Sequence, residues 1–450
     1  MSSPGGPKPE GEIAAQLRLA VPLAAQQLGF QLMGTVDAVM LGHYNDTALA
    51  ASGIGNNLLF AITSIGLGFV MGMDSVVPQA IGGFRRDDAR RYLAAGIRLA
   101  VIVGLACSVV VLASPLVLEL TNIPSEVANE SRTYVFLRAL GVIPFLLSVA
   151  LRSYLAANHV TRPLIIVVIV GNVANALLDL ALIFGVSAIG LPPLGVIGAG
   201  IATLSVQLVI VVVYFAAVRG LDAGAPRVKA TRADVNLIAR YGAPVGGQLF
   251  AEVGIFGVAT ILAGHLGTLP AAAHSIALNI SSFTFAVAVG VGSATSVRVG
   301  HAIGAGDRAL ARRRGLSSVA IGVTGMTVFA IAFVALPGPI ARVFTDDPAV
   351  VAATIPLLQI AAVFQLSDGA QAIAAGALRG IGDTRATLVG NLVGHYGVGL
   401  AISLTLAFGV GLGAPGLWWG LSAGLTATAV YLVIRFARAT HPSSARSLGI

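Results

Sequence analysis

The chain has 450 residues, of which 56% are hydrophobic and only 10% are charged. This composition lies far outside the range of soluble globular proteins and indicates a multi-pass membrane protein. The formal net charge is +8 at pH 7, but the basic residues alternate between successive loops, which a phosphate-binding surface does not require. We therefore expect the lipid bilayer, and no nucleic acid, as the partner of this charge.

Twelve segments of about the length that spans a bilayer follow one another along the chain, joined by short polar loops. They leave no room for a separate soluble domain, so we predict an all-α protein. The segments are 15–42, 48–78, 93–117, 133–157, 161–186, 193–218, 237–265, 269–300, 313–336, 350–377, 384–410 and 414–437.

Basic residues cluster after the second, sixth and eighth segments. The opposite loops are neutral to acidic, as in "NDT" at 45–47 and "TDD" at 345–347. The positive-inside rule then predicts that both termini are cytoplasmic and that the protein lies in the inner (cytoplasmic) cell membrane. The basic residues used in this argument are Lys8, Arg18, Arg85, Arg86, Arg90, Arg91, Arg219, Arg227, Lys229, Arg232, Arg308, Arg312, Arg313, Arg314 and Arg435.

The sequence repeats itself at a spacing of 222 residues. Pro22 matches Pro244, Gln26 matches Gln248, and the arginines at 86, 90 and 91 match those at 308, 312 and 313. Each half has six segments, an even number, so the halves start on the same membrane face and are related by a pseudo-two-fold axis along the membrane normal. We predict an amino-terminal lobe at 1–219, a cytoplasmic linker at 220–236 and a carboxy-terminal lobe at 237–450.

Four acids lie inside the predicted spans: Asp37, Asp179, Glu252 and Asp368. An ionised carboxylate at the centre of a span costs about 2.5–3.5 kcal/mol on an insertion scale. Most basic residues lie in loops or at segment ends, and we expect Arg152 to reach the lipid headgroups by snorkelling. The counter-charge is therefore expected from outside the chain, as protons, Na⁺ or an organic cation, although structural acids that never titrate remain an alternative.

The residues around these acids are polar or aromatic at helical spacing. Asn175 lies four residues before Asp179, and Gln248 lies four residues before Glu252, so each pair shares a helix face. Gln365 and Gln371 flank Asp368. Phe256 and Phe364 each lie one turn from a carboxy-lobe acid, where they line a pocket suited to lipophilic cations or, alternatively, pack against other helices.

No motif in the sequence predicts an enzyme. It contains no HExxH or CxxC spacing, and Cys107 is the only cysteine, so neither a zinc site nor a disulfide is expected. No nucleophile and base pattern stands out, no cofactor is implied, and the loops are too short for the sensing domain of a receptor. We expect a transporter that acts as a monomer.

The sequence resembles the multidrug and toxic compound extrusion (MATE) family, NorM-type branch, over nearly its whole length. The most specific stretches are "HSIALNISSFTF" at 274–285, "GSATSVRVGHAIGAGD" at 292–307 and "QLSDGAQAIAAGALRGIGDTR" at 365–385. The resemblance implies a two-lobed exporter that exchanges Na⁺ or H⁺ for cytoplasmic drugs, most often organic cations. A flippase for a lipid-linked saccharide, or an exporter of a native metabolite, is the alternative on the same superfamily fold.

The resemblance also implies roles for particular residues. The cation-coupling aspartate of the family corresponds to Asp37, with Asn175, Asp179 and Thr203 as its companions and as ligands of a possible Na⁺. In the carboxy lobe, the family's acids correspond to Glu252 and Asp368. Phe364 stands where some NorM-type members have a tyrosine, so a Na⁺ ion in that lobe would lack one oxygen ligand.

Overall fold

The computed structural model describes residues 11–116, 123–226 and 228–441. Lys8 and Arg227, on which part of the topology prediction rested, lie outside these residues. The described chain is helical, and its only β-type pairing is an isolated bridge between Val186 and Leu191. The prediction of an all-α protein is confirmed.

The helices fall into two successive sets, one in each half of the chain. The first set is α1 (Glu12–Tyr44), α2 (Asp46–Met71), α3 (Met73–Gly82), α4 (Arg86–Ala113), α5 (Ser125–Leu140), α6 (Val142–Ala157), α7 (Arg162–Phe184) and α8 (Val196–Leu221). The second set is α9 (Arg232–His265), α10 (Thr268–Gly304), α11 (Arg308–Ala335), α12 (Pro337–Arg342), α13 (Pro348–Ile381), α14 (Thr384–Asn391), α15 (Leu400–Leu404) and α16 (Ala414–Ala439).

Eleven stretches of the described chain are long and apolar enough to cross a membrane. The twelfth predicted segment, 15–42, lies in α1, which is 33 residues long but more polar than this standard allows. Its buried polar groups find partners inside the protein: Gln16 Nε2 donates to Thr295 Oγ1 at 3.2 Å, and Gln26 Nε2 donates to the Tyr214 hydroxyl at 2.7 Å. Protein partners let α1 serve as the twelfth span.

Several predicted segments consist of more than one helical piece. The segment 48–78 is divided into α2 and α3 at Gly72, and 133–157 is divided into α5 and α6 at Gly141. The segment 384–410 contains two π-helical stretches, at Leu392–Gly399 and Thr405–Gly409. Hydropathy cannot distinguish α from π turns, so the sequence gave no sign of this irregular span.

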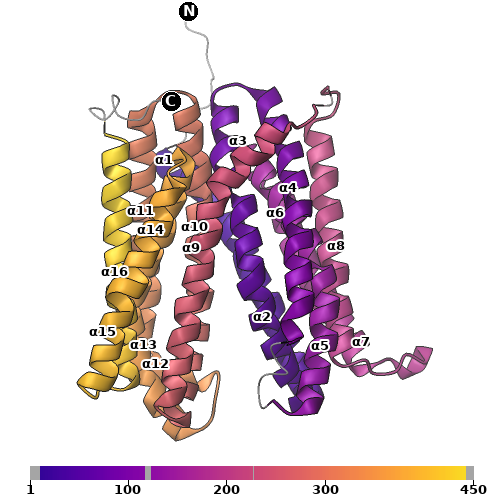
Figure 1. Cartoon of the computed structure of the whole chain (residues 1–450), viewed down its shortest axis with the longest axis vertical. Coiled ribbons are helices and arrows are strands. Elements are labelled where there is room, and N and C mark those ends of the chain that lie inside the picture. Colours follow the sequence, from indigo (N-terminus) through magenta and orange to yellow (C-terminus); the bar gives the residue numbers. More distant parts are fainter. Residues whose placement is uncertain (1–10, 117–122, 227, 442–450) are drawn as a thin grey trace, which may run out of the picture.

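The two sets of helices form two bundles that lie side by side, with both chain ends at the same end of the molecule (Figure 1). We call the bundles the amino lobe, α1–α8, and the carboxy lobe, α9–α16. Their arrangement is the pair of six-span bundles that the 222-residue repeat predicts.

The lobes touch along two seams of small residues near the end that carries both termini. A Cβ added to Gly68 of α2 would lie 2.1 Å from the backbone nitrogen of Gly246 on α9. A Cβ added to Gly290 of α10 would lie 2.3 Å from the Cα of Ala24 on α1. Gly68 and Gly290 occupy equivalent repeat positions, as do Ala24 and Gly246, so each seam repeats the other. Toward the opposite end the ribbons of the lobes diverge (Figure 1).

One sequence-based expectation about charge is wrong. Arg152 does not reach the headgroups: it is 6% exposed, and its Nη1 donates to Gln27 Oε1 on α1 at 3.2 Å. Internal hydrogen-bond acceptors, which hydropathy does not reveal, keep this guanidinium inside the protein.

Candidate functional site

Four of the predicted site residues come together inside the amino lobe. Asn175 Nδ2 donates to Asp37 Oδ1 at 2.7 Å and also to Asp179 Oδ2. The Thr203 hydroxyl donates to the other oxygen of Asp37, Oδ2, at 2.9 Å. Asp37, Asn175 and Asp179 are buried. One amide group therefore bridges two carboxyl groups in the interior of the lobe.

Three helices position this group, and a glycine lets two of them approach closely. Asp37 lies on α1, Asn175 and Asp179 lie one turn apart on α7, and α1 packs against α7. A Cβ added to Gly29 of α1 would lie 2.7 Å from a methyl group of Val168 on α7. The absence of a side chain at Gly29 therefore permits the helix spacing that the Asp37–Asn175 hydrogen bond needs.

The amino-lobe site has more acceptors than donors. Asp179 Oδ1 and Asn175 Oδ1 are both buried and have no hydrogen-bond partner among the described residues. A buried acceptor without a partner costs free energy, and an uncompensated carboxylate costs more. A bound proton or a small cation would supply the missing positive charge and the missing partner for these oxygens.

The carboxy lobe holds a second buried acidic group. Gln371 Nε2 donates to Glu252 Oε1 at 3.1 Å, and Gln248, one turn before Glu252, also bonds to this carboxylate. Asp368, one turn before Gln371 on α13, is 4% exposed and interacts electrostatically with Glu252. Gln365 points elsewhere and donates to Thr284 Oγ1. Glu252, Asp368, Gln248 and Gln371 thus form the polar part of this group.

Aromatic rings pack beside the carboxy-lobe acids. The ring centroids of Phe256 and Phe364 lie 6.1 Å apart, edge to face, and Phe364 lies 5.4 Å from the Trp418 ring. Phe364 is 2% exposed, so its ring is part of the packed interior of the lobe. His395 from the first π-helical stretch lies 6.3 Å from Phe256. The result is an acidic group with an aromatic wall.

None of the four intramembrane acids takes part in an ion pair among the described residues, where the acidic partners are Glu12, Asp87, Asp88, Asp234 and Asp383. Arg379, 5% exposed on α13, has Glu252 and Asp74 as charged neighbours, but no nitrogen of Arg379 lies within 4.0 Å of either in these pairs. The acids therefore have no resident salt-bridge partner in the described chain.

The two acidic groups stay apart in this conformation. The hydrogen bonds of Asp37, Asn175, Asp179 and Thr203 remain within the amino lobe, and those of Glu252 remain within the carboxy lobe. Each lobe thus carries its own acidic group. Among the described residues, no cluster of three or more His, Cys, Asp or Glu side chains fits a metal ion.

Sequence reasoning missed a buried polar group nearer the termini. Asp74 of α3 is 6% exposed and accepts a hydrogen bond from Ser153 Oγ at 2.7 Å, while Arg152 and Arg379 are also buried. Asp74 lies close to the end of its predicted segment, where charged residues normally meet water. The triplet Ala-Leu-Arg, at 150–152 and again at 377–379, is the signal that pairs the two arginines through the repeat.

Two bundles of membrane-spanning helices, each with unpaired acids in its interior, define a membrane transporter with two related lobes. The MatE family model matches residues 22–181 and 244–405, one match per lobe, and the two matches begin at the spacing of the repeat. The chain belongs to the MATE family.

Individual relatives agree with this assignment. The chain is 36% identical over 440 residues to "Probable multidrug resistance protein NorM" of Bradyrhizobium diazoefficiens, covering 94% of this chain and 93% of the relative. It is 35% identical over 431 residues to "Multidrug resistance protein NorM" of Burkholderia vietnamiensis, covering 93% and 92%. Among solved structures, the eukaryotic MATE transporter AtDTX14 superposes with a TM-score of 0.86 at 22% identity, covering 95% of this chain and 98% of that one.

Proposed function

We propose that this protein is a secondary antiporter that exports lipophilic organic cations in exchange for Na⁺ or H⁺. The observation that carries the proposal is the absence of ion pairs at Asp37, Asp179, Glu252 and Asp368 within the described chain. The names of the NorM relatives support multidrug compounds as the substrate class.

Burial of these acids makes them sensitive to any cation that reaches them. Asp179 Oδ1 and Asn175 Oδ1 have no partner within the described chain, and a proton or Na⁺ at that point would satisfy both. The donor set of two carboxylates, an amide oxygen and a hydroxyl suits a hard cation such as Na⁺. In the carboxy lobe, the acids beside Phe256 and Phe364 suit a larger cation with apolar surface.

Coupling follows from competition for the same negative charge. A cation that neutralises the acids lowers their attraction for a second cation, and the effect is reciprocal because it is a coupling free energy. Inward flow of the coupling ion then drives release of the drug, provided that the lobes alternate between two orientations. The protein works as a monomer in the inner membrane, with both termini in the cytoplasm.

Dye efflux tests this proposal most directly. The purified protein is reconstituted into vesicles, and a Na⁺ gradient and a pH gradient are imposed separately. We expect transport of a cationic dye against its own gradient with one of the two ion gradients and none without a gradient. Equal dye movement with and without both gradients would contradict antiport.

Export of a lipid-linked saccharide is the second candidate. A pyrophosphate linkage needs basic groups, and the described chain offers buried Arg152 and Arg379. Asp74 is a charged neighbour of Arg379, and the four unpaired acids outweigh two arginines, so cation export is favoured. Movement of a fluorescent anionic lipid, with no dye transport, would support the second candidate instead.

A further inference from the structure

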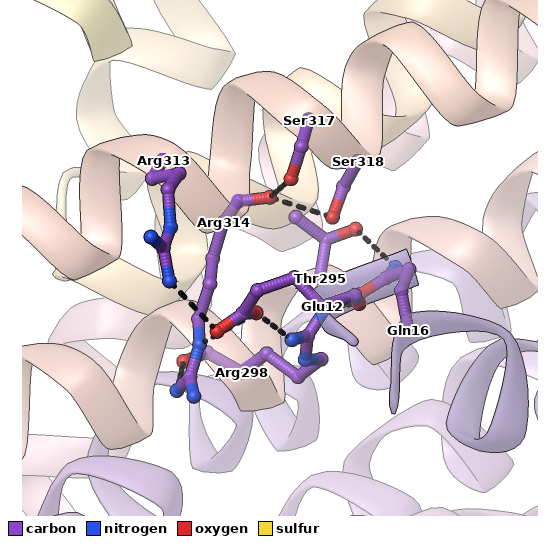
Figure 2. A network of polar contacts seen from close by, with 8 residues as sticks. All are labelled: Glu12, Gln16, Thr295, Arg298, Arg313, Arg314, Ser317 and Ser318. Carbon is purple, nitrogen blue, oxygen red and sulfur yellow. Dashed lines mark hydrogen bonds and ion pairs between the residues drawn. The ribbon is translucent and has the colours of Figure 1, made fainter. Parts of the chain in front are cut away.

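A cluster of ionic contacts joins the lobes at the end that carries the termini. Glu12, the first residue of α1, binds Arg298 of α10 and lies 3.2 Å from Arg313 Nη2 and 3.3 Å from Arg314 Nε of α11. Gln16, one turn later on α1, accepts from Arg298 Nη1 at 3.0 Å. Figure 2 shows the three guanidinium groups gathered around the single carboxylate. One acid of the amino lobe is thus held by three arginines of the carboxy lobe.

The internal repeat places a second ion pair in the equivalent position. Glu12 corresponds to Asp234, and Arg313 corresponds to Arg91, at the same spacing of 222 residues. Asp234 Oδ1 of α9 lies 3.4 Å from Arg91 Nε of α4. In both pairs, the acid lies in the first turn of its lobe's first helix, and the arginine lies in the first two turns of a helix of the other lobe. The repeat has therefore preserved a reciprocal exchange of charges.

The ion pairs stand beside the seams that hold the lobes together. Ser296 Oγ of α10 donates to the carbonyl oxygen of Asp74 on α3 at 3.0 Å, and Gln79 Nε2 donates to the carbonyl oxygen of Gly380 at 2.9 Å. Both bonds cross between the lobes. If the lobes separate at this end, all of these contacts are lost at once.

We propose that Glu12 and Asp234 are the gating residues of this transporter: their ion pairs with the opposite lobe hold the terminus-bearing end closed and break when that end opens to admit substrate. This inference rests on the proposed function, because only a transporter that alternates between two orientations has to open this end. No residue of the two acidic sites takes part.

The two ion pairs contribute unequally. Glu12 balances three guanidinium groups, one of them on Arg298, which is only 4% exposed. Separation would leave these three positive charges close together without a carboxylate. Arg91 also pairs with Asp88 of its own helix at 3.1 Å, and Asp234 also caps α9 through Thr231, so this pair keeps other partners after opening. Glu12 is therefore the stronger of the two.

A buried reporter cysteine measures opening without any transport. Ser296 is 0% exposed at the lobe interface, and Ser296→Cys in a Cys107→Ser background keeps a side chain of similar size. The protein, in lipid nanodiscs without substrate, is treated with a water-soluble maleimide. We expect Glu12→Gln to raise the labelling rate of this cysteine roughly three- to tenfold, and Asp234→Asn to raise it less.

Two controls separate gating from general loosening. Asp383→Asn removes a carboxylate that pairs with Arg435 at 2.8 Å inside the carboxy lobe, with an exposure of 22% compared with 31% for Glu12. It should leave the labelling unchanged. The native Cys107, buried within the amino lobe, should label equally slowly with and without Glu12→Gln. Faster labelling of Cys107, or an equal effect of Asp383→Asn, would overturn the proposal.

A mutant cycle tests whether Asp234 acts through Arg91. If the two form a gating pair, Asp234→Asn combined with Arg91→Gln should speed labelling no more than the larger single change. Effects that simply add would contradict the pairing. If Glu12→Gln does not fold, Arg313→Gln, a change at a largely exposed side chain, replaces it.

The readout also distinguishes this inference from the proposed function. Unchanged labelling in Glu12→Gln and Arg313→Gln, with normal ion-driven efflux, would overturn the gating role alone. Faster labelling in a protein that moves no dye under any gradient would support the gate and count against antiport.

Discussion

At the scale of single residues, the most informative feature is the amide of Asn175 between two carboxyl groups. It donates to both Asp37 and Asp179, yet Asp179 Oδ1 and its own Oδ1 are left without partners in the described chain. A purely structural acid would be expected to have its acceptors satisfied. The incomplete bonding favours a site that a proton or cation enters and leaves.

Replacing Asp37 with Asn tests this reading. The variant keeps the size of the side chain and removes the charge, so we expect ion-driven dye efflux to fall roughly tenfold or more. The protein should still reach the membrane at a normal level. Asp46→Asn, an equivalent change at an exposed residue at the start of α2, is the matched control. Efflux equal to that of the control would rule out a coupling role for Asp37.

At the scale of helices, α1 carries most of the functional geometry. It supplies Asp37 to the amino-lobe site, Ala24 to one seam and Glu12 to the inter-lobe ion pairs. A shift of α1 along or across its neighbours would therefore act on all three. This arrangement gives a physical route by which loading of the site and movement of the lobes become linked.

Two glycines of α1 offer a test of its position. Gly29→Ala would place a methyl group against Val168 of α7, at 2.7 Å, whereas Gly34→Ala meets no atom within 4 Å. We expect Gly29→Ala to separate α1 from α7, weaken the Asp37–Asn175 hydrogen bond and lower initial dye efflux about threefold. Gly34→Ala should have no such effect. Equal activity of the two variants would argue against tight control of the site by helix spacing.

The seam between α2 and α9 gives a second test. Gly68→Ala would place a methyl group 2.1 Å from the Gly246 backbone nitrogen, so the helices must move apart. We expect the Ser296→Cys reporter to label roughly three- to tenfold faster in this variant. Gly257→Ala on α9, where nothing lies within 4 Å, should label at the unmodified rate. A slow rate in Gly68→Ala would mean that the seam tolerates separation without opening.

At the scale of the whole molecule, the repeat explains why so much was predictable. The spacing of 222 residues predicts two bundles, and the apolar segments predict their helices; the four acids stand out because charge inside a span is costly. The contacts between lobes were not predictable. Glu12 and Asp234 lie at segment ends, where charged residues normally face water, and only the folded chain shows that their partners lie on the opposite lobe.

The same limit applies to buried cations and to irregular helix. Arg152 was expected at the headgroups because a long side chain near a segment end usually reaches them, but Gln27 on another helix holds it inside. The π-helical stretch that carries His395 has the same hydropathy as an α-helix. In each case the decisive interaction joins residues far apart in the sequence, which local patterns do not encode.

The central claim is that drug and coupling ion compete for the same buried acids, and equilibrium binding tests it most directly. The affinity of a cationic dye for the purified protein in nanodiscs is measured at several Na⁺ concentrations and pH values. The account predicts that the dye binds more weakly as the Na⁺ or the H⁺ concentration rises, and that Asp37→Asn or Asp368→Asn reduces this dependence. A dye affinity that stays constant across all Na⁺ concentrations and pH values would contradict it.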